Sequence, residues 1–482
     1  MTRTEISPIR RKTAAVATTM SVTTLLVVAC GGGGDGASGT GPVPSAASAK
    51  GTLAIVTDSS STFVVPAAGV TEYQKHLQIA TANAGGASPV NDAPPNGSAA
   101  LYDATSLRRQ WCYNAENTAA PPELQDRAII APVQVFENIW AFGPRWVLQY
   151  AFKADNGKVF LIDALNNTGE AQAITEPGLV RMGASGSLLE GVMPTHGHGD
   201  HYGGAGYLQA KYGIPVYLGS ADAGVGATAT PPFVVTPLDS SNLQPQSRDF
   251  GGLKTTLLST PGHTAGTFSG IVPAKLAGKE YRLAFWGGTA FPGTLALARS
   301  YLDGSERLYR LAAAEKIDGT FHTHPFVDGS LGKLDALTKN PPSYATANPF
   351  LIGKALAMRS LSVLRECSAA KVAQLDATAK ITPWHTTSLQ ASGTTRRYPG
   401  GVEVDVSAVV RNPYGALQNA AVKFTVASTG ATCTSYTDAS GKASCLILVA
   451  SSAAGSVSAE FAEGTLVDGS VELASSATVQ LQ

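Results

Sequence analysis

Thr195-His196-Gly197-His198-Gly199-Asp200-His201-Tyr202-Gly203-Gly204 places three imidazoles and one carboxylate within six residues. The first two histidines are two residues apart, so they point to the same side of an extended segment, and the glycines between them let the loop turn tightly. Imidazole nitrogens and carboxylate oxygens are ligands that suit zinc. The chain has eight histidines and this loop holds three of them. The loop therefore predicts a metal site rather than a solvated polar loop.

Length and composition limit the class of protein to which this chain can belong. A chain of 482 residues is too long for one ordinary core, so we expect two or three domains. It carries 35 basic and 35 acidic side chains, for a formal net charge of zero. No run of Lys or Arg offers a track for phosphates, so nucleic acid is not an expected partner. The 51 glycines and the low share of charged residues, 15%, are typical of a β-rich exported protein.

The N-terminus has the pattern of an export signal. Residues 1–29 begin with basic side chains and continue with an apolar, Thr-rich stretch that stops at Cys30. The end of this stretch resembles the lipobox of bacterial lipoproteins, which implies acylation of Cys30 and a membrane-anchored protein of the periplasm, outer membrane or cell surface. The alternative is an ordinary signal peptide with a chance cysteine. Residues 30–50, rich in Gly, Ser and Ala, predict a flexible linker.

Three apolar runs in the central part of the chain each lead into a histidine or a tight glycine turn. Residues 188–194 are a predicted strand that leads into the first loop. A predicted helix (205–212) and a strand (214–218) follow the loop. This order predicts an α/β unit with ligands at the carboxyl end of a strand. A strand at 255–259 leads to His263, and a strand at 281–286 ends at Gly287-Gly288-Thr289. A predicted helix (305–316) then returns to His322 and His324.

By these residues the chain resembles the metallo-β-lactamase superfamily, whose signature is His-x-His-x-Asp-His followed by Gly-His-Thr-x-Gly and a late histidine. The resemblance covers roughly residues 126–376 and implies an α/β fold, the αββα sandwich. It also implies that one zinc is held by His196, His198 and His263 and a second by Asp200, His201 and His324. His322 is a rival for the last position because it lies two residues away.

One position departs from much of the superfamily. Hydrolases of this superfamily that act on glutathione thioesters or homoserine lactones have an aspartate that bridges both metals, and here Gly288 stands in its place. The resemblance is therefore to subclass B3 β-lactamases, which lack the bridge. We expect two zinc ions, with the second site weaker or partly empty.

The predicted metals imply a zinc-dependent hydrolase in which a metal-bound hydroxide attacks a carbonyl of a small-molecule substrate. Asp200 would bind the second zinc and also take a proton, as the catalytic residue. A β-lactam is one candidate substrate, and a non-lactam ester, lactone or amide is another, with residues 221–246 expected to shape the pocket. A hypothesis from a different class is a surface binding or adhesion protein in which the zinc fold is a scaffold.

Several residues near the motifs have two interpretations. Asp163 follows the apolar run 159–162 and either orients a metal ligand or caps a turn. Tyr202 and Thr289 either line the pocket or serve packing and turn hydrogen bonding. His76 and His385 lie outside any motif, so we expect packing or surface roles for them.

The cysteines other than Cys30 form two candidate pairs. In an oxidising compartment Cys112 and Cys367 would tie the N-terminal extension to a late helix, and the alternative is two buried free thiols. From residue 396 the pattern alternates as in a β-sandwich, and 437–443 resembles a hairpin of bacterial Ig-like (invasin/intimin-type) repeats, which a Cys433–Cys445 bond would close. This all-β Ig-like module is expected to act as a spacer or to bind a surface partner.

We therefore predict five segments: a lipoprotein signal peptide (1–29), a linker (30–50), an N-terminal extension (51–125), a metallo-β-lactamase-like domain (126–394) and an Ig-like domain (395–482).

Overall fold

The computed structural model describes residues 51–59, 61, 63–85, 104–116, 120–184, 186–339, 348–450 and 455–481. The predicted signal peptide, Cys30 and the linker lie outside the described residues. Within the described ranges, no helix is both long enough and apolar enough to cross a membrane.

The first of two central sheets has seven strands in sequence order. Its first four strands are antiparallel neighbours, and the turn at Asp155-Asn156-Gly157 joins β4 to β5 as a hairpin. From β5 onward the strands are parallel. The strands are β2 (Ile129–Phe136), β3 (Ile139–Pro144), β4 (Gln149–Lys153), β5 (Val159–Ile162), β6 (Leu189–Met193), β7 (Val216–Gly219) and β8 (Val235–Leu238).

The second sheet has five strands in the order β13-β12-β11-β10-β9. It is antiparallel except for the pairing of β12 with β13. The strands are β9 (Gln246–Phe250), β10 (Leu253–Ser259), β11 (Phe268–Leu276), β12 (Lys279–Phe285) and β13 (Gly319–Phe321).

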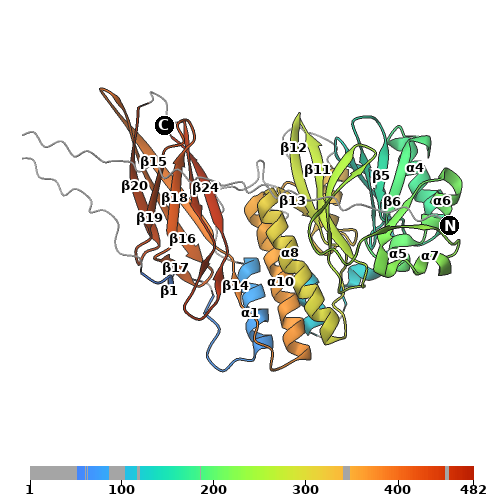
Figure 1. The fold of residues 1–482 in the computed structure, drawn as a ribbon, viewed down its shortest axis with the longest axis horizontal. Helices are drawn as coiled ribbons and strands as arrows, with labels where there is room; N and C mark the ends of the chain where they lie inside the picture. The colour runs from blue at the N-terminus through green and yellow to red at the C-terminus, as the bar shows by residue number, and fades with distance from the viewer. Residues whose placement is uncertain are drawn as a thin grey trace, which may run out of the picture. The chain divides into compact units, whose positions relative to one another are not determined.

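Three apolar clusters show that these sheets form a sandwich with helices on both outer faces. Between the sheets, Phe152 and Phe160 of the first share a core with Phe268 and Phe285 of the second. Outside the first sheet lie α4 (Glu176–Arg181) and α6 (Ala205–Tyr212), and outside the second lie α8 (Leu295–Glu315) and α10 (Lys354–Leu375), as Figure 1 shows. A strand that is covered on both faces typically consists of a continuous run of apolar residues, as β5 does. The predicted αββα class is confirmed.

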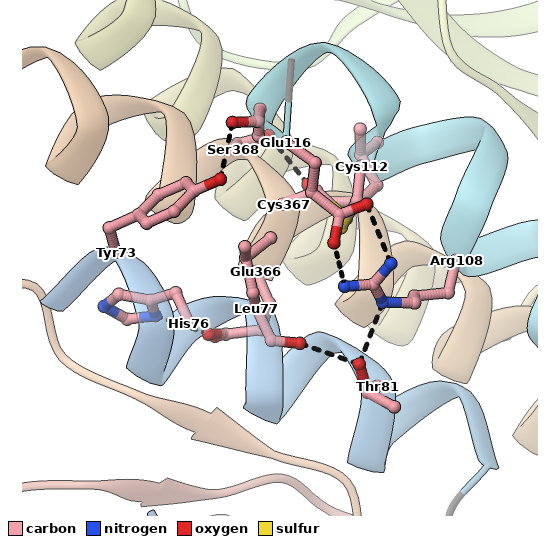
Figure 2. Close-up of a disulfide and its surroundings, with 12 residues drawn as sticks. Tyr73, His76, Leu77, Thr81, Arg108, Cys112, Glu116, Glu366, Cys367 and Ser368 are labelled. Carbon is pink, nitrogen blue, oxygen red and sulfur yellow. Dashed lines mark hydrogen bonds and ion pairs between the residues drawn. A yellow bond between two sulfur atoms is a disulfide. The ribbon is translucent and has the colours of Figure 1, made fainter. Parts of the chain in front are cut away.

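The N-terminal helices α1 (Glu72–Gly85) and α2 (Ala104–Glu116) pack onto α10. A disulfide joins Cys112 of α2 to Cys367 of α10, and both residues are fully buried. On α1, His76 lies beside Glu366 of α10 (Figure 2). The two helices of the extension are therefore part of the helical layer.

The C-terminal region is an all-β structure in which a five-stranded and a four-stranded sheet share a core, and β14, β23 and β22 form a third, small sheet. Buried and exposed residues alternate along the strands, as expected for a sandwich. The strand β1 (Ala54–Val56) from the N-terminal extension pairs with β17 of this region. The remaining elements are β14 (Trp384–His385), β15 (Ser388–Tyr398), β16 (Gly401–Asn412), β17 (Gly415–Gln418), β18 (Ala421–Val426), β19 (Thr432–Tyr436), β20 (Lys442–Val449), β21 (Ser456–Phe461), β22 (Gly464–Thr465), β23 (Val471–Glu472) and β24 (Ser475–Gln480).

The predicted hairpin between the last two cysteines is wrong. The strand with Cys433, β19, pairs with β18, whereas the strand with Cys445, β20, pairs with β16 in the other sheet. The turn at residues 437–441 therefore carries the chain from one sheet to the other. The Cys433–Cys445 disulfide is present, and it joins the two sheets instead of closing a hairpin.

Candidate metal centre

The histidine-rich loop leaves β6 and is held against the segment that follows β5. The backbone N–H of Ala164 donates to the carbonyl of His201, and the N–H of Gly204 donates to the carbonyl of Ala164. A Cβ on Gly203 would collide with the backbone of Asn166. The two glycines at the end of the motif are therefore needed for this close approach of two backbones.

His196, His198 and His263 form the first of two groups in which candidate ligand atoms converge. The Nε2 atom of His196 lies 3.1 Å from the Nδ1 atom of His198. The ring of His263, which follows β10, lies 4.5 Å from that of His196 and 4.7 Å from that of His198 between centroids. His196 is fully buried, whereas the other two side chains reach solvent.

Asp200, His201 and His324 form the second group. The Nε2 atoms of His201 and His324 are 3.1 Å apart, and the Oδ2 atom of Asp200 lies 3.4 Å from the first and 3.5 Å from the second. The two groups adjoin, because the rings of His196 and His201 are 4.1 Å apart between centroids. The structure thus brings all six residues predicted as ligands into two neighbouring groups of three.

The spacing of these atoms fits zinc. A tetrahedral zinc with bonds of about 2.0–2.1 Å has ligand atoms separated by about 3.3 Å. The observed separations of 3.1, 3.4 and 3.5 Å in the second group are close to that edge length. Imidazole and carboxylate donors are also the ligands that zinc accepts, so the residues present can hold two zinc ions.

Two candidate ligands, His263 and His324, use their other ring nitrogen in a contact that fixes the ring. The Nδ1 atoms of His263 and His324 face the carbonyls of Ala290 and Trp146 at 2.8 and 2.6 Å. These acceptors hold the Nδ1 proton, which leaves Nε2 free to bind a metal. The carbonyl groups gave no signal in the sequence, because any residue type can supply one.

Asp163 holds the ring of His201 in the same way. Its Oδ2 atom lies 2.6 Å from Nδ1 of His201, and its Oδ1 atom accepts from the N–H of Thr195 at 2.6 Å. Asp163 is fully buried and has a φ of 66°, a left-handed conformation that is uncommon outside glycine. Such strain at a residue that supports a candidate site fits a ligand-orienting role better than a simple turn cap.

The charges within the site follow from burial and from these contacts. Burial, helped by neighbouring imidazoles, lowers the pKa of His263 to about 3 and the pKa of His324 to about 4. Burial also disfavours the charged form of His201, but the carboxylates of Asp163 and Asp200 raise its pKa to about 10. In return, although burial opposes its ionisation, the pKa of Asp200 is held well below its usual range, mainly by His201.

Asp222 is a site residue that the sequence reasoning missed. Its Oδ2 atom accepts from the N–H of Gly197 at 2.8 Å and from the hydroxyl of Thr264 at 2.5 Å, and its Oδ1 atom accepts from the N–H of Gly266 at 2.9 Å. One carboxylate therefore joins the loop of His196 and His198 to the loop of His263. The available signal was its place shortly after β7, at the same end of the sheet as the other site residues.

Gly288 leaves no room for a bridging ligand. A Cβ at this position would collide with the side chain of His263. An aspartate could stand here only if His263 moved. The absence of a carboxylate at this position is therefore built into the packing of the first group.

The other residues singled out in the sequence have structural roles. His322 is buried beside the second group but is not among its converging atoms. Tyr202 packs on Phe233, and the carbonyl of Thr289 accepts from a tyrosine hydroxyl. His76 and His385 are both buried, so neither is a surface residue. Each lies beside a buried glutamate instead: Glu366 at 2.6 Å and Glu472 at 2.8 Å.

Comparison with known proteins places this site in a family context. Residues 144–275 match the sequence profile of the metallo-beta-lactamase superfamily. A hydroxyacylglutathione hydrolase of Dechloromonas aromatica is 30% identical over 164 residues, which are 34% of this chain and 55% of the relative. One of Hahella chejuensis is 30% identical over 173 residues, which are 35% of this chain and 59% of the relative. The chain thus spans a little over half the length of these relatives.

Solved metallo-beta-lactamase structures are also similar to part of this chain. A subclass B3 metallo-beta-lactamase of Bradyrhizobium japonicum is 22% identical, with a TM-score of 0.40 over 49% of this chain and 92% of that one. A variant metallo-beta-lactamase from Legionella gormanii is 16% identical, with a TM-score of 0.43 over 51% and 97%. The sequence match and the two groups of ligand atoms in an αββα sandwich lead to one conclusion. This chain contains a domain of the metallo-beta-lactamase superfamily.

Proposed function

We propose that this domain is a zinc-dependent hydrolase that attacks a carbonyl, with an arrangement of the B3 β-lactamase type. The observation that carries the proposal is the pair of adjoining three-ligand groups with Gly288, and no carboxylate, at the bridging position. Six protein ligands for two ions leave coordination positions open, and a catalytic zinc site keeps such a position for water or substrate.

Zinc bound at such a site polarises a carbonyl oxygen and lowers the pKa of bound water to about 7. Side chains of the protein fix the metal ligands and accept the proton. Asp163 retains the proton on Nδ1 of His201 and so fixes that ring. The Oδ2 atom of Asp200 faces His201 and His324, and this carboxylate, 21% exposed, can accept a proton from the attacking water.

Two substrate classes are supported by different observations. Gly288 supports a β-lactam, because it matches the arrangement without a bridging aspartate. The relatives named hydroxyacylglutathione hydrolase support a thioester as the second candidate. Another ester, lactone or amide has the same reacting carbonyl and belongs in the same test.

The test is turnover by the zinc-loaded protein on a panel with a chromogenic cephalosporin, a hydroxyacylglutathione thioester, simple esters and a homoserine lactone. We expect hydrolysis of at least one compound, lost on chelation, restored by zinc and absent in His196→Ala. A protein that binds two zinc ions but hydrolyses none of the panel would refute the proposal. It would favour the alternative in which the zinc fold is a scaffold for surface binding.

We also propose that the chain is an exported lipoprotein and that the C-terminal sandwich is an Ig-like spacer or binding module. The support for the anchor is the signal-like composition of residues 1–29 before Cys30. The support for the module is its two-sheet core and alternating strands. Incorporation of labelled palmitate into the membrane-bound protein, lost in Cys30→Ser, tests the anchor. Label in the Cys30→Ser variant would contradict it.

A further inference from the structure

The N-terminal extension is firmly fixed to the helical layer behind the metal centre. Figure 2 shows the Cys112–Cys367 disulfide between α2 and α10, flanked by polar contacts. Arg108 of α2 donates to Glu116 and also to the hydroxyl of Thr81 on α1, which joins the two N-terminal helices. Tyr73 of α1 donates to the carbonyl of Ala115 at 2.9 Å. Helix α2 thus has a defined position on α10.

Trp111 precedes the disulfide cysteine and points toward the metal centre. Its side chain is 4% exposed and its ring meets the ring of His322 edge-on, with centroids 5.8 Å apart and an angle of 68° between the planes. Among the described residues, the Nε1 atom of Trp111 has no hydrogen-bond partner, so it makes no hydrogen bond to His322. Packing of the two rings, rather than a polar contact, therefore holds them together.

His322 in turn holds the main chain of a candidate ligand. Its Nδ1 atom accepts from the backbone N–H of His324 at 2.9 Å, and His322 is 1% exposed. The ring of His324 is fixed at its far side by the carbonyl of Trp146. His324 is thus held at two points, and one of them depends on where the ring of His322 lies.

We propose that the N-terminal extension completes the second metal group: Trp111, fixed by the Cys112–Cys367 disulfide, is a positioning residue that holds His322 and, through it, His324. Without the indole, the ring of His322 can turn into the vacated space and release the N–H of His324. His324 would then approach Asp200 and His201 less accurately. The first group has no part in this chain of contacts and should keep its affinity.

The inference rests on the proposed metal centre but not on the substrate. Partners that orient metal ligands typically change metal affinity by about 10–100-fold when they are removed. Because Trp111 acts through one intermediate residue, we expect the low end of this range, about tenfold, at the second group. Turnover is not needed to measure it.

The experiment is zinc titration of the full chain, with the two binding steps resolved by calorimetry and total zinc measured by elemental analysis. The variants are Trp111→Leu, His322→Leu and the double variant. Trp384→Leu is the matched control, because Trp384 is 5% exposed in the same apolar cluster but lies outside this chain of contacts. Circular dichroism checks that each variant is folded, and Trp111→Phe replaces Trp111→Leu if the latter does not fold.

We expect Trp111→Leu and His322→Leu to weaken the second zinc alone, and the double variant to be no weaker than His322→Leu, because both act on one path. Unchanged second-site affinity in folded Trp111→Leu, or an equal loss in Trp384→Leu, would overturn the proposal. Absence of turnover on every substrate would refute the proposed hydrolase and leave these affinities as evidence for the inference.

Discussion

The carboxylate of Asp222 accepts three hydrogen bonds and thereby connects two ligand loops. Asn at this position keeps one acceptor oxygen, but its amide nitrogen faces N–H or O–H donors, so at least one bond is lost. We expect Asp222→Asn to weaken zinc binding at the first group by about tenfold or more, as removal of an orienting partner does.

A matched control for this prediction is Asp239→Asn, in the same stretch of chain. Asp239 is an exposed turn residue whose carboxylate accepts from Ser241 and contacts neither ligand loop. Calorimetric zinc titration of both variants makes the comparison. Equal first-site affinity in the two proteins would show that Asp222 does not position the loops.

His201 makes metal binding at the second group dependent on pH. Because Asp163 and Asp200 raise its pKa to about 10, Nε2 of His201 carries a proton at neutral pH before a metal binds. Zinc must displace that proton, so binding at the second group should release about one proton and weaken about tenfold for each unit that pH falls below 10. Burial and neighbouring imidazoles lower the pKa of His263, so the first group should release almost none near pH 7.

Calorimetry in buffers with different ionisation enthalpies measures the number of protons released at each step. Equal release at the two steps would contradict the assignment of a protonated His201 to the second group.

At the scale of elements, helix α10 carries a buried charged cluster that fastens the N-terminal helices. Glu366 and Arg365 are 0% and 1% exposed and lie 2.5 Å apart, and Glu366 also contacts His76 of α1 at 2.6 Å. Arg365 also pairs with Glu306, so neutralising Glu366 removes one of its two carboxylate partners and the buried carboxylate beside His76. We therefore expect Glu366→Gln to lower the free energy of unfolding by about 3 kcal/mol.

Urea unfolding followed by tryptophan fluorescence measures this change, with Glu315→Gln as the control. Glu315 pairs with Arg282, which is 47% exposed, so its loss should cost no more than about 1 kcal/mol.

Burial opposes ionisation of Glu366, but Arg365 and His76 lower its pKa below the ordinary 4.5. The contribution of Glu366 to the free energy of unfolding is thus complete above pH 4.5 and is lost as pH falls through the folded-state pKa. A difference between wild type and Glu366→Gln that persists unchanged at lower pH would contradict this account.

At the scale of the whole molecule, the two disulfides close loops of very different length. Cys112 and Cys367 are 255 residues apart, whereas Cys433 and Cys445 are 12 apart. A cross-link that closes the longer loop removes more entropy from the unfolded chain, with model values of about 5 against about 3 kcal/mol. All five tryptophans precede residue 395, so their fluorescence follows the domain with the metal centre.

We expect replacement of Cys112 and Cys367 by alanine to shift the fluorescence transition in urea to clearly lower concentration. Replacement of Cys433 and Cys445 should leave that transition in place and change only the circular dichroism of the β-rich region. A fluorescence shift of equal size in both variants would show that the loops do not act separately.

The sequence by itself determined the fold class and the chemistry of the site. Both depend on local pattern: apolar runs that end in Gly-flanked histidines indicate strands with ligands at their carboxyl ends. The helix predicted over 205–212 is α6. The family match agrees with the αββα prediction, while the ligand roles of the six residues stay a prediction until zinc is measured.

Only the tertiary structure decided which distant groups meet. His322 and His324 are equivalent by spacing, and packing alone places one among the converging atoms and the other against Trp111. Asp222 looks like any turn carboxylate until two loops close around it. The Cys433–Cys445 segment reads as a hairpin, yet its strands join different sheets. In each case the local sequence allows several partners, and the choice depends on long-range burial that no short stretch encodes.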